Sequence, residues 1–122
     1  MKKRVLYVDD NPHNRHLVRQ IVVAAGYEML EAEDGESGWV VAYHKLPDLI
    51  FVDLLLPGID GFELTRQIKT TPGLSHIPIA TLTSYGNRET ERLARAAGCV
   101  EFLHKPPNTQ QIEAVLSRFL EN

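Results

Sequence analysis

The sequence predicts an α/β fold, a doubly wound parallel sheet of five strands in the order 2-1-3-4-5 with five helices on its two faces. Apolar runs of strand length alternate with helical periodicity five times along the 122 residues. That alternation is typical of a parallel sheet wrapped by helices. Helix start and stop signals separate the runs. We therefore expect one domain, residues 1–122, with a core that needs no disulfide or structural metal.

The strand order follows from where charge falls in the apolar runs. These runs span residues 4–8, 27–31, 48–52, 77–82 and 100–103. The first and third are continuous apolar stretches. Strands that are covered on both faces have such sequences, so both should be central in the sheet. The second contains Glu28 and Glu31 and the fifth contains Glu101, which an edge strand tolerates. Order 2-1-3-4-5 with right-handed crossovers satisfies these placements.

The expected helices are bounded by residues that favour helix termini. In chain order the signals are Asn11 with Pro12, Gly26, Asp60 with Glu63, Gly98, and Asn108 with Gln111. The first, third and last of these are start signals and the two glycines are stop signals. Because Asp60 precedes Gly61 and Glu63, we interpret it as a helix cap and not as a metal ligand.

Composition narrows the function classes. The net charge is −3, which argues against nucleic acid as the direct partner. The apolar runs are far shorter than a membrane span, and Lys2, Lys3 and Arg4 precede too few apolar residues for a signal peptide. The single cysteine, Cys99, cannot form an internal disulfide. We therefore expect a cytoplasmic protein that binds neither nucleic acid nor membrane.

Four ionisable residues lie just past the apolar runs. Asp9 and Asp10 come after the first, Asp53 after the third and Lys105 after the fifth. In a parallel sheet these ends meet at one edge, and ligands bind there in the crevice where the strand order reverses, between strands one and three. Three carboxylates and one ammonium at that edge predict a site for a divalent cation and a phosphoryl group.

The chemistry of this set suggests a role for each member. Three neighbouring carboxylates repel one another by a few kcal/mol per pair, on the order expected at an effective dielectric of 20. Lys105 offsets one charge, which leaves about two for a divalent ion such as Mg²⁺. A carboxylate can also attack phosphorus. Asp53 stands alone on the middle strand and is our candidate nucleophile, while Asp9 and Asp10 hold the metal. Thr83 offers a hydroxyl to a phosphate oxygen.

These residues resemble the receiver domain of response regulators in two-component signalling, in its single-domain, chemotaxis-regulator-like form. The motifs that carry the resemblance are Asp9-Asp10, Asp53 with Leu56-Pro57-Gly58 and Asp60-Gly61, Thr83-Ser84, and Lys105-Pro106, and together they cover essentially the whole chain. The resemblance implies a flavodoxin-like topology and a phosphoryl group accepted on Asp53 from a histidine kinase or phosphorelay partner. It implies Mg²⁺ (or Mn²⁺) bound by Asp10, Asp53, the backbone carbonyl of Leu55 and, through water, Asp9.

The resemblance also implies a switch. Thr83 and Phe102 would form the switch pair, the hydroxyl moving toward the phosphoryl group while the aromatic ring turns inward. The surface of the fourth helix, fifth strand and fifth helix would then be read by a downstream protein target, with the chain a monomer or a phosphorylation-dependent dimer. Such a protein is not an enzyme with a separate substrate, although it catalyses its own phosphorylation and its slow dephosphorylation. The resemblance further implies a cis bond between Lys105 and Pro106.

Two positions depart from the common receiver pattern. Leu55 lies two residues after Asp53, and Tyr85 lies two residues after Thr83. Both side chains are bulky and neither can orient an attacking water as a carboxylate or amide could. We therefore hypothesise slow self-dephosphorylation.

Three other functions compete with a phosphorylated receiver. A haloacid-dehalogenase-like phosphotransferase would need a second Asp where Leu55 stands. A flavodoxin-like cofactor binder would need a phosphate-cradling loop after the first strand, where Asp9-Asp10-Asn11 stands instead. A phosphorylation-independent receiver-like interaction module remains open. The acid cluster, Thr83 and Lys105 favour the phosphorylated receiver over it.

Overall fold

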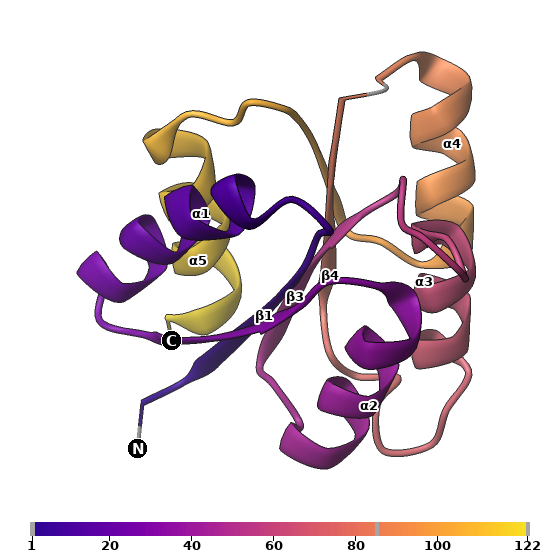
Figure 1. Cartoon of the computed structure of the whole chain (residues 1–122), viewed down its shortest axis with the longest axis horizontal. Helices are drawn as coiled ribbons and strands as arrows, with labels where there is room; N and C mark the ends of the chain where they lie inside the picture. The colour runs from indigo at the N-terminus through magenta and orange to yellow at the C-terminus, as the bar shows by residue number, and fades with distance from the viewer. Residues whose placement is uncertain (1, 85, 122) are drawn as a thin grey trace.

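The computed structural model describes residues 2–84 and 86–121, and in this part of the chain five strands alternate with five helices (Figure 1). The strands are β1 (Arg4–Val8), β2 (Glu28–Ala32), β3 (Leu49–Asp53), β4 (Ile79–Thr83) and β5 (Glu101–His104). The helices are α1 (Pro12–Ala24), α2 (Gly35–Lys45), α3 (Gly61–Lys69), α4 (Arg88–Ala97) and α5 (Thr109–Leu120). All four strand pairings are parallel and the order is β2-β1-β3-β4-β5. The predicted fold class is confirmed.

The core forms two layers because side chains alternate across each strand. One face carries Val5, Tyr7, Leu49, Phe51, Ala80 and Leu82, and α1 and α5 pack on it. The opposite face carries Leu6, Val8, Ile50, Val52 and Ile79, and α2, α3 and α4 pack there. Figure 1 shows this division, with α1 and α5 on one side of the sheet and the other three helices on the opposite side. Covered on both faces, β3 and β4 are buried throughout.

The predicted edge strands are confirmed, and an acidic residue of each is paired with arginine. In β2, Glu31 accepts a hydrogen bond from Arg15 at 3.0 Å and forms a second ion pair with Arg19. In β5, Glu101 pairs with Arg118 of α5. These carboxylates are tolerated because an edge strand leaves one side open to solvent and to long basic side chains.

The helix termini also lie where the sequence predicts. Asn11, Asp60 and Asn108 are the N-caps of α1, α3 and α5, and each side chain accepts a backbone N–H of the first turn. Gly98 is the C-cap of α4 at φ +124°, and Gly26 follows α1 at φ +96°. These positive φ values lie in the region that glycine reaches without strain. Asp60 is therefore a helix cap, as interpreted.

Four strands begin and end one or two residues later than expected, and the shifts of the third and fourth bear on the site. The third strand begins at Leu49 because Asp48 pairs with Arg4, accepting its backbone N–H at 2.8 Å. The fourth begins at Ile79 because Pro78 has no N–H for a strand ladder. At their other ends these two strands extend one residue further than expected, so that Asp53 and Thr83 are their last residues. Among the described residues, no helix is both long and apolar enough to cross a membrane.

Candidate functional site

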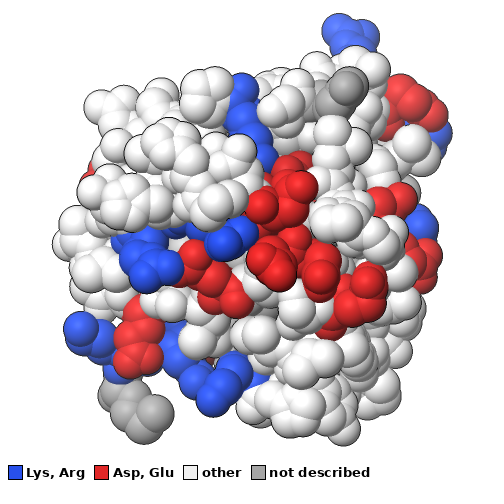
Figure 2. Space-filling view, viewed as in Figure 1, with Lys and Arg blue, Asp and Glu red and all other residues white. Residues whose placement is uncertain are grey.

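Three carboxylates meet at the carboxyl edge of the sheet, between β1 and β3. Asp9, Asp10 and Asp53 each offer an oxygen, and these oxygens lie within 4.8 Å of one another. Figure 2 shows acidic side chains gathered in one patch across the middle of this face, with basic side chains beside it. Asp9 is fully buried, Asp53 is 6% exposed and Asp10 is exposed. The predicted convergence is confirmed, and Asp10 is the most accessible carboxylate of the three.

Lys105 lies between two of these carboxylates. Its ammonium donates to Asp9 Oδ2 at 2.5 Å and to Asp53 Oδ2 at 2.8 Å. The side chain is 11% exposed, so it contributes its charge inside the site and not on the surface. Its backbone N–H donates to the Thr83 carbonyl at 2.9 Å, and the Lys105–Pro106 bond is cis. The structure therefore places the predicted cation, Lys105, in direct contact with two of the predicted carboxylates, Asp9 and Asp53.

Asp9 is held by donors from the protein itself. Oδ2 accepts from the Tyr7 hydroxyl at 2.5 Å and from the Asn14 amide at 3.3 Å, in addition to the Lys105 ammonium. Oδ1 accepts from the Asn11 N–H at 2.9 Å. A buried carboxylate needs such partners because an unpaired one costs several kcal/mol, in order of magnitude. Asp9 is thus a fixed element of the site.

The two buried acids respond differently to their surroundings. Burial raises the pKa of Asp53, and the hydrogen bonds from Lys105 and Leu55 offset this only in part. Burial also acts to raise the pKa of Asp9, but the donors Lys105, Tyr7 and Asn11 outweigh it and leave the pKa below the ordinary value. Burial acts to lower the pKa of Lys105, and its two carboxylate partners reverse this so that the pKa is raised. Lys105 is therefore a cation at neutral pH.

The loop that follows Asp53 is held in place from two sides. Asp53 Oδ1 accepts the Leu55 N–H at 3.1 Å, which folds the loop back onto the carboxylate. At the start of α3, a Cβ on Gly61 would meet the Asp53 carbonyl, so only glycine allows this close approach. From α2, Glu36 accepts the Ile59 N–H at 3.0 Å. The Leu55 side chain itself is exposed.

The two predicted switch residues lie in different places. Thr83 is buried at the end of β4, one residue beyond Leu82, which is the partner of Asp53 in the ladder. Phe102 lies in β5 opposite Thr81, half-buried among the side chains under α2, α3 and α4. The structure therefore brings Thr83 to the acidic edge and leaves Phe102 on a neighbouring surface. Tyr85 lies outside the described residues.

Tyr7, Arg15 and Glu36 are among the residues of the site that were not predicted from the sequence. Tyr7 could have been, because alternation along β1 places it on the same side as Asp9. Arg15 donates from Nη1 to the Asp9 backbone carbonyl at 2.5 Å. Glu36 holds the loop after β3 from 23 residues away. For these two no sequence signal exists, since both contacts depend on how helices pack against loops.

Comparison with known proteins agrees with this geometry. The family model described as response regulator receiver domain matches residues 5–117. The polar-differentiation response regulator DivK of Brucella anthropi is 32% identical over 120 residues, covering 98% of each chain. A putative response regulator from Chloroflexus aurantiacus has a similar structure, with a TM-score of 0.94 and 30% identity over the whole of both chains.

A third relative bears on the acidic edge. The receiver domain of a sensor histidine kinase from Pseudomonas aeruginosa is 26% identical over the whole of both chains, with a TM-score of 0.91. That structure holds a magnesium ion coordinated in its active-site cleft. Because the family match spans the strands and the residues of the acidic edge alike, this chain belongs to the response regulator receiver domains of two-component signalling.

Proposed function

We propose that Asp53 accepts a phosphoryl group from a histidine kinase or a phosphotransfer protein. The observation that carries this proposal is the placement of Lys105, 2.8 Å from Asp53 and 2.5 Å from Asp9, at an edge that solvent reaches through Asp10. An oxygen of Asp53 attacks phosphorus, the bond from phosphorus to the donor imidazole nitrogen breaks, and that nitrogen keeps the electron pair. The product is an acyl phosphate on Asp53.

We also propose that the site uses Mg²⁺, or Mn²⁺. Asp10, Asp53 and the Leu55 carbonyl would bind it, and Asp9 would contribute through water because its own oxygens already accept protein donors. The residues fit such an ion, since three carboxylates and one lysine leave about two negative charges and offer hard oxygen ligands. When bound, the ion neutralises charge on the transferring phosphoryl group.

Lys105 and Thr83 would contact the phosphoryl oxygens, the first through its ammonium and the second through its hydroxyl. A phosphoryl group adds about −1.5 to −2 charges and strong acceptors, enough to bias a two-state element. In our proposal Thr83 and Phe102 are that element, and the surface of α4, β5 and α5 presents the result to a downstream protein. The chain would not turn over a separate substrate.

Intact-protein mass after incubation with acetyl phosphate tests this function. Wild type with Mg²⁺ should gain one phosphoryl group, while Asp53→Asn and a sample with chelator should gain none. Asp60→Asn is the matched control, because Asp60 is an exposed N-cap outside the cluster and its variant should still be labelled. If wild type gains nothing under conditions that label another receiver, the proposal is wrong and the chain is an interaction module that works without phosphate.

A further inference from the structure

We propose that Tyr7 is a positioning residue of the phosphorylation site, whose hydroxyl keeps Asp9 paired when Lys105 turns to the phosphoryl group. This inference rests on the proposed function and assigns a role to a side chain that the chemistry above does not use. The Tyr7 hydroxyl makes its hydrogen bond to Asp9 and not to Asp53, the residue that would accept the phosphoryl group. It acts through its hydrogen bond to Asp9, and in this way it influences where the Lys105 ammonium can lie.

The Tyr7 hydroxyl is held rigidly against the carboxylate. The side chain is fully buried in β1, and its ring lies edge-on to Phe51 with the ring centres 6.3 Å apart. Asp9 lies two residues further along the chain, just past the end of β1, and its Oδ2 accepts the hydroxyl at 2.5 Å. An O–H donor on a carboxylate at such a distance is a charge-assisted hydrogen bond, about twice as strong as a neutral one. Tyr7 is therefore a fixed donor.

Tyr7 and Lys105 share one acceptor atom. Both donate to Asp9 Oδ2, and the same ammonium also donates to Asp53 Oδ2. A phosphoryl group on Asp53 brings nearly two negative charges to the far side of Lys105 and draws the ammonium toward it. Asp9 is fully buried, so it could release its cation only if other donors remain. The hydroxyl of Tyr7 is the strongest of those left.

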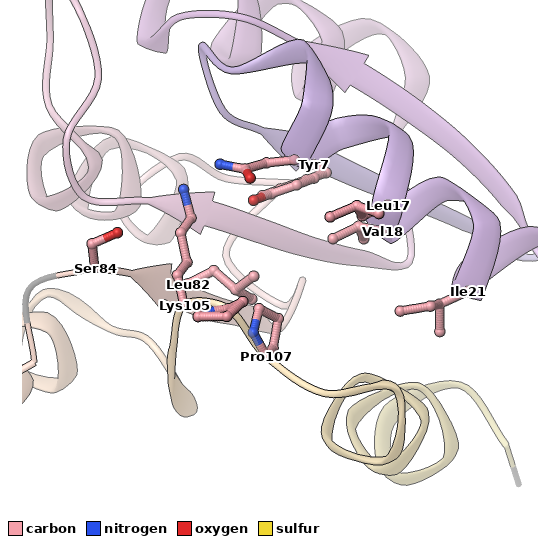
Figure 3. Close-up of a pocket in the computed structure, with 10 residues that line it drawn as sticks. Tyr7, Leu17, Val18, Ile21, Leu82, Ser84, Lys105 and Pro107 are labelled. Carbon is pink, nitrogen blue, oxygen red and sulfur yellow. The ribbon is translucent and has the colours of Figure 1, made fainter.

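The space around Lys105 makes this competition decisive. A cavity of about 260 Å³ lies between α1, the end of β4 and the residues that follow β5. Figure 3 shows Tyr7 and Lys105 on its wall with Leu17, Ile21 and Pro107. Because the lysine stem borders an open space on this side, packing alone does not fix its ammonium. Hydrogen bonds to the carboxylates decide where the charge sits.

A purely structural role for Tyr7 predicts different behaviour. If Tyr7 is only a core aromatic residue whose hydroxyl hydrogen-bonds to the nearest carboxylate, replacing it by phenylalanine should change the stability of the protein and not its rate of phosphorylation. If the hydroxyl instead frees Lys105 for the phosphoryl group, Tyr7→Phe should leave Lys105 bound to Asp9 and slow phosphorylation even when the metal site is full. Losing a hydrogen bond to a charged group, taken at the lower end of its usual strength, corresponds to a rate that is about tenfold slower.

The test compares Tyr7→Phe with Tyr27→Phe as the matched control, because the Tyr27 hydroxyl lies at the edge of the sheet, 3.5 Å from Glu121. Three quantities are measured: the rate of phosphorylation by acetyl phosphate at saturating Mg²⁺, the Mg²⁺ dissociation constant without phosphoryl donor, and the melting temperature. We expect Tyr7→Phe to be about tenfold slower with a dissociation constant within about twofold of wild type. Tyr27→Phe should match wild type in both.

Each other outcome overturns the inference. Equal rates for a folded Tyr7→Phe and wild type would leave the receiver function intact and remove the role of Tyr7. A slower rate explained by weaker Mg²⁺ binding or by partial unfolding would make Tyr7 structural. If the variant does not fold, proton NMR of the wild-type protein provides the test. The Tyr7 hydroxyl proton is assigned through the Tyr7 ring protons. Its signal should persist after phosphorylation, and loss of the signal refutes the proposal. Failure of wild type to accept phosphate refutes the proposed function instead.

Discussion

Replacing Lys105 by methionine removes the only cation that, among the described residues, hydrogen-bonds to the carboxylates of Asp9 and Asp53. Methionine keeps the length and the apolar stem, so the change is mainly one of charge. The oxygens of the acid cluster lie within 4.8 Å of one another. Two unit charges at that separation repel by about 3.5 kcal/mol at an effective dielectric of 20. Lys105 is 11% exposed, so solvent screens this repulsion only weakly.

We expect Lys105→Met to lose about 2–3 kcal/mol of unfolding free energy at neutral pH without metal, which is below the full repulsion because Asp53 can take up a proton. Burial already raises the pKa of Asp53, and without Lys105 it rises further. The deficit is therefore fully present where both carboxylates are ionised. It shrinks as the pH falls through the raised pKa of Asp53, because a protonated Asp53 no longer repels Asp9.

Urea unfolding with and without saturating Mg²⁺ measures both effects. A divalent ion replaces part of the missing charge, so Mg²⁺ should stabilise Lys105→Met more than wild type. Lys69→Met is the control: Lys69 donates to the backbone carbonyls of Ser75 and Ile77, so its loss costs stability with no change in the Mg²⁺ effect. An unchanged midpoint for Lys105→Met, or an equal Mg²⁺ effect in all three proteins, would refute the electrostatic account of the site.

Three further predictions concern other parts of the molecule. Leu55→Asn combined with Tyr85→Glu should shorten the lifetime of the phosphorylated protein, because polar side chains there can orient water; an unchanged decay of the added mass contradicts this. Leu46 caps α2 at φ +49° with its side chain exposed, so Leu46→Asn should raise the unfolding free energy by about 0.5–1 kcal/mol, and a lower urea midpoint would count against it. Burial raises the pKa of the Cys99 thiol, so a disulfide reagent should modify it roughly tenfold or more slowly in the native protein than in urea, and equal rates would be inconsistent with a buried thiol.

The sheet and the convergence of its polar ends could be predicted because both follow from patterns along the chain. Glu28, Glu31 and Glu101 identify edge strands without any knowledge of what they contact. Once the order is known, parallel topology brings the carboxyl ends of β1 and β3 together, and Asp9, Asp53 and their neighbours come with them. The strand boundaries were less accurate, since Asp48 and Pro78 lie at the starts of the expected strands but just before the first paired residues, Leu49 and Ile79.

The chemistry of the two adjacent acids, Asp9 and Asp10, assigned them equally to the metal, and only the resemblance to receivers distinguished a direct role for Asp10 from a role through water for Asp9. In the structure Asp9 is buried among protein donors and Asp10 is exposed. Alternation along an extended chain explains the difference, because neighbouring residues point to opposite sides. The contacts of Arg15 and Glu36 lie beyond such reasoning, since they depend on the packing of α1 and α2 against loops distant in sequence.

Lys105 connects the chemistry of the site to the strands that would carry its signal. Its ammonium is shared by Asp9 and Asp53, while its backbone N–H joins the end of β5 to the Thr83 carbonyl at the end of β4. Phosphorylation of Asp53 would replace one carboxylate charge by nearly two charges on the phosphoryl group, so the net charge of the site would change by only about one unit. In our proposal the larger change would be in which anion the Lys105 ammonium contacts. A switch that operates through competition for one cation would depend most on the donors that let Asp9 release it, and for this reason Tyr7 should affect phosphorylation more than it affects metal binding.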